Sequence, residues 1–327
     1  MNIRSRSAIH ESAKNALDRA PHAQRIVLIY TAVCCGLALL GTLLTAFFSD
    51  RISGTGGLSS IGLRSVLSTG QSLLPLVQTV ITVCLGLGYH IAILTITRGY
   101  EATPQVLRQG FRYWGTLIRS MLLQGFIYLG LGFLATYLSA YLFLMTPDAE
   151  PFMEILEPVL SSMTVMDESI VLDDATYLAV SEAMLPMFRI LIPVFLILIL
   201  PTFYSFRMVT FCLAEEPRRG ALAAMTKSRR LMRRNRFALF RLDLTLWWYY
   251  LGSVLVVLVC YADALLPLAG IALPWSSTVS FYVFYLLSMA MQFVLNYLAM
   301  NRVYAAYAIA YDALQDQLQP PVYPVQQ

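Results

Sequence analysis

The sequence predicts an all-α membrane protein with six transmembrane helices, on the strength of three observations. Of its 327 residues, 58% are hydrophobic and 13% are charged, whereas soluble globular proteins average about 45–50% apolar and about 25% charged residues. The mean hydropathy is +0.64. The charged residues leave six long uncharged runs, and a helix needs about 20 mostly apolar residues to cross the hydrocarbon core. A soluble fold is therefore excluded.

The uncharged runs are typical of helices rather than of barrel strands. Strands of a membrane barrel alternate apolar and polar residues, whereas residues 191–200 are apolar on every side. Arg189 and Arg207 lie near the two ends of the fourth run, and we expect both to extend to the membrane interfaces. The predicted spans are about Ile26–Phe48, Leu73–Ile96, Ser120–Leu144, Phe188–Thr210, Leu244–Leu266 and Val279–Met300.

The distribution of Lys and Arg predicts the orientation, because cytoplasmic loops carry an excess of both residues. Basic residues precede the first span and fill the loops after the second and fourth spans, whereas the first opposite loop has only Arg51 and Arg64. Both termini are therefore expected in the cytoplasm, with the spans paired as three helical hairpins. Residues 1–25 form a cytoplasmic arm without the features of a secretory signal, residues 26–307 the membrane domain and residues 308–327 a cytoplasmic tail.

The same arrangement of segments recurs three times along the chain, over about residues 8–96, 100–212 and 217–307. Each unit begins with a short amphipathic segment expected at the cytoplasmic interface, followed by an outward crossing and a return. In the second unit Thr103 and Pro104 predict a helix start, with Thr103 as the cap and proline in the first turn. The alternative is that the rhythm only reflects an even number of spans with basic inner loops.

An acidic outer loop occupies residues 146–187. Its Asp and Glu spacing does not match a calcium-binding EF-hand loop, which needs acids at alternate positions and a central glycine. Pro151 opens a pattern of apolar residues at helical spacing, and Pro158 is expected to kink it. This predicted amphipathic helix would lie as a lid across the outer mouth of the bundle. Its apolar residues are Phe152, Ile155, Leu156, Val159, Leu160 and Met163.

A basic inner helix is predicted over residues 218–241, the densest charge feature of the chain. Polybasic segments beside a membrane attract anionic headgroups, and a cytoplasmic protein partner is the other candidate. Nucleic acid is not expected, because the segment is tied to the membrane at both ends. A stripe of apolar residues is expected to be buried: Ala221, Ala224, Met225, Leu231 and Met232. The predicted lipid or partner contacts are Lys227, Arg229, Arg230, Arg233, Arg234 and Arg236.

Four amides lie within the predicted spans, where the usual role of such groups is to hydrogen-bond between helices. They are Gln78, Gln124, Gln292 and Asn296. If they lined one water-filled cavity, transport would be favoured; a sealed apolar bundle would favour a scaffold. Asp243 lies at the inner mouth of the fifth span, where Arg241 or a neighbouring arginine can pair with it. Pro193 and Pro201 predict a kink or a break in the fourth span.

No pattern of catalytic, metal-binding or cofactor-binding residues is present. The five cysteines lack C-x-x-C spacing, which argues against zinc or redox chemistry. His90 has no histidine or acid at i±3 or i±4, the spacing that a zinc site on a helix needs. Nucleotide-binding loops, hydrolase motifs and metalloprotease motifs do not occur. We therefore expect neither an enzyme nor a bound cofactor or metal.

Residues 221–251 carry a resemblance to a known family. They run from an Ala-rich start through Ser228, Leu231 and Asn235 to a Trp-bearing membrane helix. Together with the preceding residues 214–217, this run resembles a family of bacterial multipass proteins known only as domain of unknown function 975. Further positions that resemble the family are Ala13, Ala16, Leu17, Tyr204, Met208, Phe281, Tyr282, Tyr304 and Tyr307. The resemblance implies the architecture and a bacterial cytoplasmic membrane, and it implies no catalytic residue.

Together these features predict a non-enzymatic multipass membrane protein. It would act as an accessory or scaffold protein, with the basic inner helix contacting anionic lipids of the inner leaflet or a protein partner. The alternative is a transporter or lipid-handling protein that uses a cavity between the three hairpins. An intramembrane enzyme is the third possibility.

Overall fold

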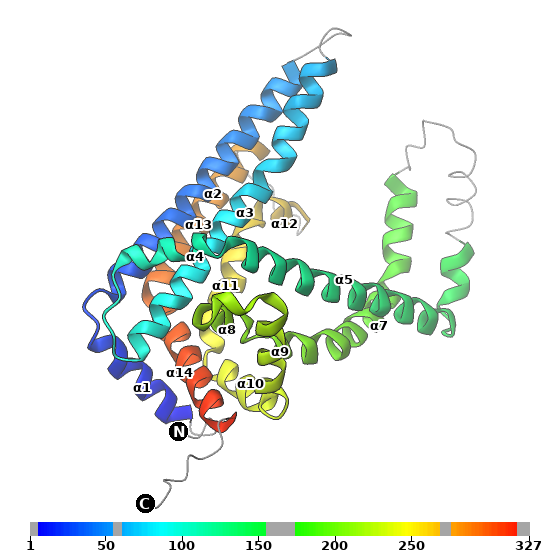
Figure 1. The fold of residues 1–327 in the computed structure, drawn as a ribbon. Helices are drawn as coiled ribbons and strands as arrows, with labels where there is room; N and C mark the ends of the chain where they lie inside the picture. Colours follow the sequence, from blue (N-terminus) through cyan, green and yellow to red (C-terminus); the bar gives the residue numbers. More distant parts are fainter. Residues whose placement is uncertain (1–5, 55–60, 155–173, 269–275, 319–327) are drawn as a thin grey trace, which may run out of the picture. The chain divides into compact units, whose positions relative to one another are not determined.

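The computed structural model describes residues 6–54, 61–154, 174–268 and 276–318, and every element in this part of the chain is helical. Five stretches of helix are long and apolar enough to cross a membrane (Figure 1). They are α2 (Ala23–Gly54), α3 (Ile61–Thr97), α5 (Trp114–Leu144), the end of α7 (Asp174–Phe206) with α8 (Val209–Glu215), and α13 (Ser277–Leu295) with α14 (Asn301–Leu318). The first, second, third and sixth predicted spans are each helical throughout.

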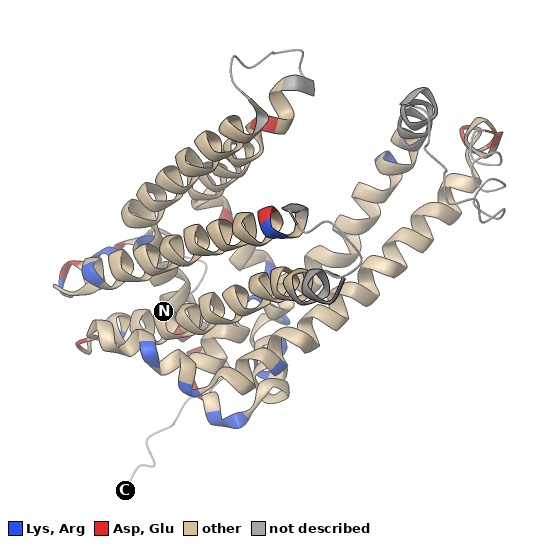
Figure 2. Ribbon diagram, turned by 90° about the horizontal axis from the view of Figure 1, so that it is seen from above, with Lys and Arg blue, Asp and Glu red and all other residues tan. Residues whose placement is uncertain are grey.

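Two further helices, α10 (Arg236–Thr245) and α11 (Trp247–Cys260), make a sixth candidate span and are bent by 69° where they meet at Leu246. The predicted fifth span thus begins beside this bend and continues into α12 (Ala262–Leu268). The long helices are almost entirely uncharged, and the blue and red positions lie mainly near their ends (Figure 2). This pattern is what a hydrocarbon environment requires.

The last helix extends beyond the predicted sixth span. A π-helical segment, Asn296–Met300, joins α13 to α14, and α14 continues to Leu318. Its side chains Ala310, Tyr311 and Leu314 are buried. Residues 308–318, predicted as part of a tail, are therefore a packed helix, because their small and apolar residues recur on one face.

The three predicted amphipathic segments are helical but differ in form. The first is α1 (Arg6–Asp18) and the third is α9 (Ala221–Met232). The second is shorter than expected, a 3-10 turn (Pro104–Arg108) followed by α4 (Gln109–Arg112). Thr103 precedes this turn in an extended conformation, but its side chain makes no capping hydrogen bond.

The predicted basic helix over residues 218–241 is not one helix. It consists of a 3-10 turn (Pro217–Arg219), α9 and the start of α10. Gly220 separates the turn from α9 with φ of +88°, a conformation that only glycine adopts without strain. A second break, at residues 233–235, separates α9 from α10.

The described chain forms two compact units, Met1–Ser120 with Arg207–Gln327 and Met121–Phe206. The first unit contains the main core, where α1 packs on α14, and α3 packs on α2, α8 and α14. Fully buried side chains include Tyr89 of α3, Met208 beside α8 and Tyr311 of α14. The long helix α2 also packs along α3, and α11 packs against α13.

Close backbone contact within this unit depends on two glycines. A Cβ atom on Gly88 of α3 would lie 2.7 Å from the Cα atom of Leu107, and one on Gly110 of α4 would lie 2.8 Å from the amide nitrogen of Gly88. Real Cβ atoms do not approach other heavy atoms so closely. The 3-10 turn and α4 can therefore lie directly on α3 because both positions lack a side chain.

The second unit consists of most of α5 and all of α7. Many of its apolar side chains are exposed, including Phe126 and Tyr137 of α5 and Ile197 of α7, as expected for helices that face lipid. The helix α7 continues unbroken through Pro193 and Pro201. The predicted amphipathic lid falls mainly on residues 155–173, which lie outside the described residues.

Candidate functional site

The basic residues of α9 and α10 lie opposite a buried apolar face. The predicted stripe is buried in full, with Ala221, Ala224, Met225, Leu231 and Met232 each no more than 8% exposed. The arginines on the other side of this segment are exposed: Arg229, Arg230, Arg233, Arg234 and Arg236. We call these five residues the basic face. In Figure 2 blue positions gather around the short helices near the C-terminal end.

Exposed aromatic side chains follow the basic face along the chain. Phe237, Trp247 and Trp248 are 61%, 60% and 43% exposed, and the guanidinium of Arg241 lies 4.4 Å from the centre of the Phe237 ring. Exposed tryptophan beside arginine is typical of segments at the headgroup level of a membrane, because the ring suits the interface and the cation suits anionic lipid.

Lys227, the sixth predicted contact, has a different environment. Its Nζ atom donates to Glu215 at 2.7 Å and to Glu216 at 3.2 Å. Burial opposes the charge of the ammonium group, but the hydrogen bonds and the charges of these two carboxylates outweigh it, so the pKa of Lys227 is raised. Lys227 thus belongs to an ion-pair network within the fold rather than to the basic face.

This network joins the end of α3 to α8, α9 and α14. Arg98 donates to Glu215 at 2.8 Å and to Asp312 at 2.7 Å, and Tyr311 donates to Glu215 at 2.7 Å. The pKa of Arg98 is raised, chiefly by its hydrogen bond to Asp312. With Lys227, two cations meet three carboxylates and a hydroxyl, so the network's main role is to hold four helices together.

A second polar site surrounds Arg207, in the turn between α7 and α8. A cavity of about 280 Å³ lies here, entirely within the first unit. The cavity is lined by one cation, one imidazole and several hydroxyl groups, together with Phe211 and Val303. These polar lining residues are His90, Arg207, Thr210, Tyr249, Tyr250, Tyr304 and Tyr307.

Hydrogen bonds connect Arg207 to Asp243 through tyrosine. An Nη atom of Arg207 donates to the hydroxyls of Tyr250 at 2.8 Å and Tyr307 at 3.0 Å. Tyr307 donates its hydroxyl hydrogen to Asp243 and is also hydrogen-bonded to Tyr250. The guanidinium is 4.9 Å from the centre of the Tyr307 ring. Tyrosines from α11 and α14 thus hold the charged group of Arg207 beside the cavity, while its expected position at a membrane interface stays a prediction.

Three interruptions of helical geometry meet at this cavity. Arg207 follows the end of α7, Tyr249 and Tyr250 follow the bend at Leu246, and Tyr304 follows the π-helical segment. Helix breaks and π-helical segments inside membrane helices often occur at binding sites, because they place polar groups where a regular helix would present only side chains to lipid. The clearest sequence signal was Arg207 itself, an ionisable residue at the end of an apolar run.

Two of the four predicted amides bond to each other. Gln292 donates to Asn296 of the same helical stretch at 2.8 Å, and the side chain of Gln78 lies against Gly41 of α2. Gln124 lies in the second unit. Spacing along a helix predicts the depth of each amide but not the direction in which it points.

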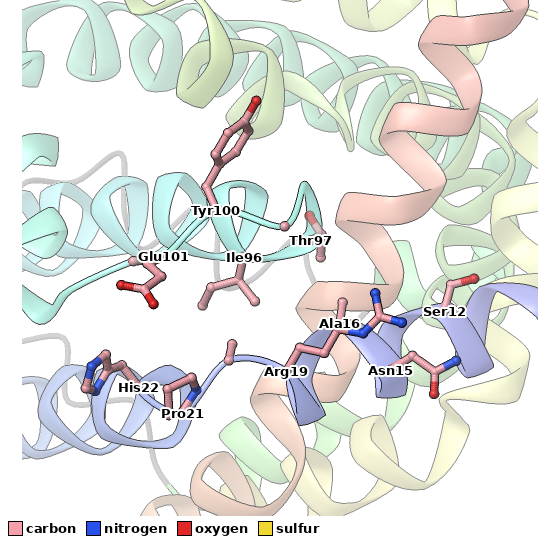
Figure 3. Close-up of a pocket in the computed structure, with 13 residues that line it drawn as sticks. Ser12, Asn15, Ala16, Arg19, Pro21, His22, Ile96, Thr97, Tyr100 and Glu101 are labelled. Carbon is pink, nitrogen blue, oxygen red and sulfur yellow. The ribbon is translucent and has the colours of Figure 1, made fainter.

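A second cavity, of about 420 Å³, lies between the end of α1 and the end of α3. Its lining includes Arg19, His22 and Glu101. Figure 3 shows Tyr100 pointing away from the other labelled side chains, while Glu101 points toward the segment that carries Pro21 and His22. Its lining carries both charge signs, so its electrostatics favour no particular ligand charge.

Within the described residues, no group of three or more His, Cys, Asp or Glu side chains could hold a metal ion. The five cysteines are free thiols, and Cys84 and Cys212 are buried.

Comparisons with curated proteins and with solved structures found no match. A family model described as "Protein of unknown function (DUF975)" matches residues 1–314, nearly the whole chain and all of the cavity and basic-face residues. The predicted resemblance is confirmed, and the chain belongs to the DUF975 family.

Proposed function

We propose that the protein is a non-enzymatic scaffold of the bacterial cytoplasmic membrane that gathers anionic lipid at its basic face. In this proposal six spans form three hairpins, and both termini lie in the cytoplasm, because the basic segments precede spans one, three and five. The observation that carries the proposal is the basic face itself, with five exposed arginines beside exposed aromatic residues and a buried apolar stripe behind them.

The proposal follows from the electrostatics of the inner leaflet. A Lys or Arg near an anionic surface contributes about 1 kcal/mol of attraction, which corresponds to about a fivefold enrichment of anionic lipid per residue. In this proposal the exposed aromatic residues that follow the arginines along the chain lie at headgroup depth. The attraction is screened by salt over about 10 Å at 0.1 M, whereas burial of the apolar stripe is insensitive to salt.

Lipid analysis of the purified protein tests this function. The five basic-face arginines are replaced with glutamine together, and co-purifying lipids are quantified by mass spectrometry after extraction in mild detergent. The variant should still insert and fold, because Lys227 and the ion-pair network are unchanged, but it should lose most of its anionic lipid. Replacing the same residues with lysine should largely preserve the lipid.

The control is Arg51→Gln, which removes an arginine from the last turn of α2, in the loop predicted on the outer side of the membrane. This change should leave the bound lipid unchanged. A glutamine variant with a full complement of anionic lipid would refute the proposal. Loss of a co-purifying protein in the lysine variant, with lipid retained, would instead identify a partner that needs the bidentate contacts of arginine.

The second candidate is a lipid-handling or transport protein, and the observation that favours it is the cavity at three helix interruptions. Alternating access in transporters commonly uses such broken helices around a central site. Cysteine placed at Thr210 in a cysteine-free background should then react with a water-soluble thiol reagent. Complete protection of this cysteine, in a protein that is otherwise folded, would argue for a sealed scaffold.

A further inference from the structure

The polar cavity beside Arg207 has the composition of an anion site. Its lining residues include an arginine and several hydroxyl groups but no carboxylate. Asp243 is the nearby acid, and the hydroxyl of Tyr307 bonds to it. The cavity therefore presents positive charge and hydrogen-bond donors, while the compensating carboxylate is reached through Tyr307.

The hydroxyl hydrogens show which groups can serve a ligand. The single hydroxyl hydrogen of Tyr307 is donated to Asp243, so its oxygen accepts from Arg207 and from Tyr250. Tyr250 can turn its hydrogen from Tyr307 toward a ligand at little cost, since the bond it gives up is replaced by one to a charged oxygen. Tyr250 also lies in the first turn of α11, whose dipole favours negative charge at that end.

His90 adds a hydrogen-bond acceptor to a cavity that otherwise offers mainly donors. Its Nδ1 atom lies 2.7 Å from the carbonyl oxygen of Gly86. Because a carbonyl only accepts, Nδ1 carries the hydrogen, and in the neutral ring Nε2 is an acceptor. A ligand that suits the whole site must therefore offer several anionic oxygens to Arg207 and Tyr250 and a hydroxyl group to His90. A carboxylate alone offers only the first.

The size of the cavity limits the ligand to a small group. A volume of about 280 Å³ equals that of about nine water molecules. It accommodates a phosphate with a few carbon atoms, whereas the acyl chains of a lipid would have to remain outside. From charge, hydrogen-bonding sense and size, we infer that the cavity binds a phosphomonoester, either the headgroup of a phosphatidic-acid-type lipid or a soluble phosphorylated polyol. The inference rests on the cavity of the second candidate function and is independent of the basic face.

Thermal unfolding and calorimetry of the full-length protein in neutral detergent test this inference with two probes. Glycerol 3-phosphate supplies the soluble phosphomonoester, and dihexanoyl phosphatidic acid supplies the same group on a short lipid. Glycerol and dihexanoyl phosphatidylcholine are the matched ligand controls. A ligand that binds only the folded state raises its melting temperature, so at least one phosphomonoester should stabilise the wild-type protein and neither control should.

Substitutions assign the effect to the cavity. Arg207→Lys keeps the charge but loses the planar fork, and should weaken binding roughly 10- to 100-fold, the range expected for a charge-assisted hydrogen bond. Tyr250→Phe should weaken it less. Arg189→Gln, an exposed position of α7, and the five-glutamine variant of the basic face should both bind like wild type.

Each result has a definite meaning. Stabilisation by either phosphomonoester supports the inference. If only one of them stabilises the protein, that result identifies the source of the phosphomonoester as a lipid or as a soluble compound; if both do, the cavity accepts either source. Absence of any effect on the wild-type protein overturns it without need of a variant. Binding that is unchanged in Arg207→Lys and Tyr250→Phe overturns it as well, and binding lost only in the five-glutamine variant would locate the ligand at the basic face.

Discussion

Replacement of Gly88 or Gly110 by alanine gives the most direct test of the packing in the first unit. The added methyl carbon would lie 2.7 Å from the Cα atom of Leu107 in one case and 2.8 Å from the amide nitrogen of Gly88 in the other. Optimal contacts between carbon atoms are about 3.5–4.0 Å. The obstructing atoms belong to the backbone and cannot rotate away. The backbone carbonyl oxygens of Leu107 and Cys84 are closer still, so the 3-10 turn and α4 must move away from α3 by more than about 1 Å.

Such overpacking costs about 1–3 kcal/mol, and more where the backbone must shift. For each variant we expect the melting temperature in detergent to fall by roughly 4–12 °C, taking 2–3 kcal/mol and about 2–4 °C per kcal/mol. The shift also separates Leu107, which is 3% exposed, from the helix that covers it.

The matched controls are Gly36→Ala in α2 and Gly130→Ala in α5, where an added Cβ atom meets no other heavy atom within 4 Å. These changes should alter stability by less than about 1 kcal/mol, in the stabilising direction, since alanine is the better helix former. Melting curves measured by intrinsic fluorescence compare the four variants. If Gly110→Ala were tolerated as well as Gly36→Ala, the close contact between α4 and α3 would be refuted.

Three further predictions concern other parts of the chain. Burial lowers the pKa of His10 from 6.5, so the folded state resists protonation of this side chain. The contribution of neutral His10 to stability is complete above pH 6.5 and is lost as the pH falls. His10→Gln should therefore make the melting temperature less dependent on pH between about 7.5 and 5 than it is in the wild-type protein. Glu215→Gln should destabilise the protein by about 1–3 kcal/mol in chemical or thermal unfolding, because Arg98 and Lys227 lose a shared carboxylate. The control Glu154→Gln, at an exposed position, should have no effect. Equal stability of the two variants would contradict the ion-pair network. Single cysteines in a cysteine-free background should report topology, and outside labelling at residue 235 would refute six spans with cytoplasmic termini. Cysteines in place of Thr55, Asp167 and Ser277 should be labelled from outside. Cysteines in place of Asn235 and Gln326 should be labelled only from inside.

The helices were predictable because the requirement for a membrane span is local. An apolar run near 20 residues is enough to predict one, and residues 26–48, 73–96 and 120–144 are indeed helical and lie in helices long and apolar enough to cross a membrane. The places where helices break were not predictable. The turn at Arg207 and the bend at Leu246 accompany hydrogen bonds between Arg207 and tyrosines 43 and 100 residues away, and no local pattern contains that information.

The basic face was partly predictable for the same reason. Helical spacing correctly separated the buried stripe of α9 from its arginines. It grouped Lys227 with the arginines and missed its partners, because Glu215 and Glu216 lie on the far side of the 3-10 turn and of Gly220. Sequence spacing describes one helix at a time, whereas this ion pair depends on how two helices meet.

The contact between the first and last helices has a consequence for biosynthesis. The helix α1 packs on α14. Just beyond α1, the carbonyl oxygen of Ala23, at the start of α2, accepts a hydrogen bond from the side chain of Asn301 at 3.0 Å, across a separation of 278 residues. At 5–20 residues per second, a ribosome needs about 14–56 s to make that length of chain. During this interval α1 lacks its partner, and its apolar face must rest on the membrane surface or on a chaperone. The N-terminal helix is thus the first to be synthesised and among the last to reach its final position.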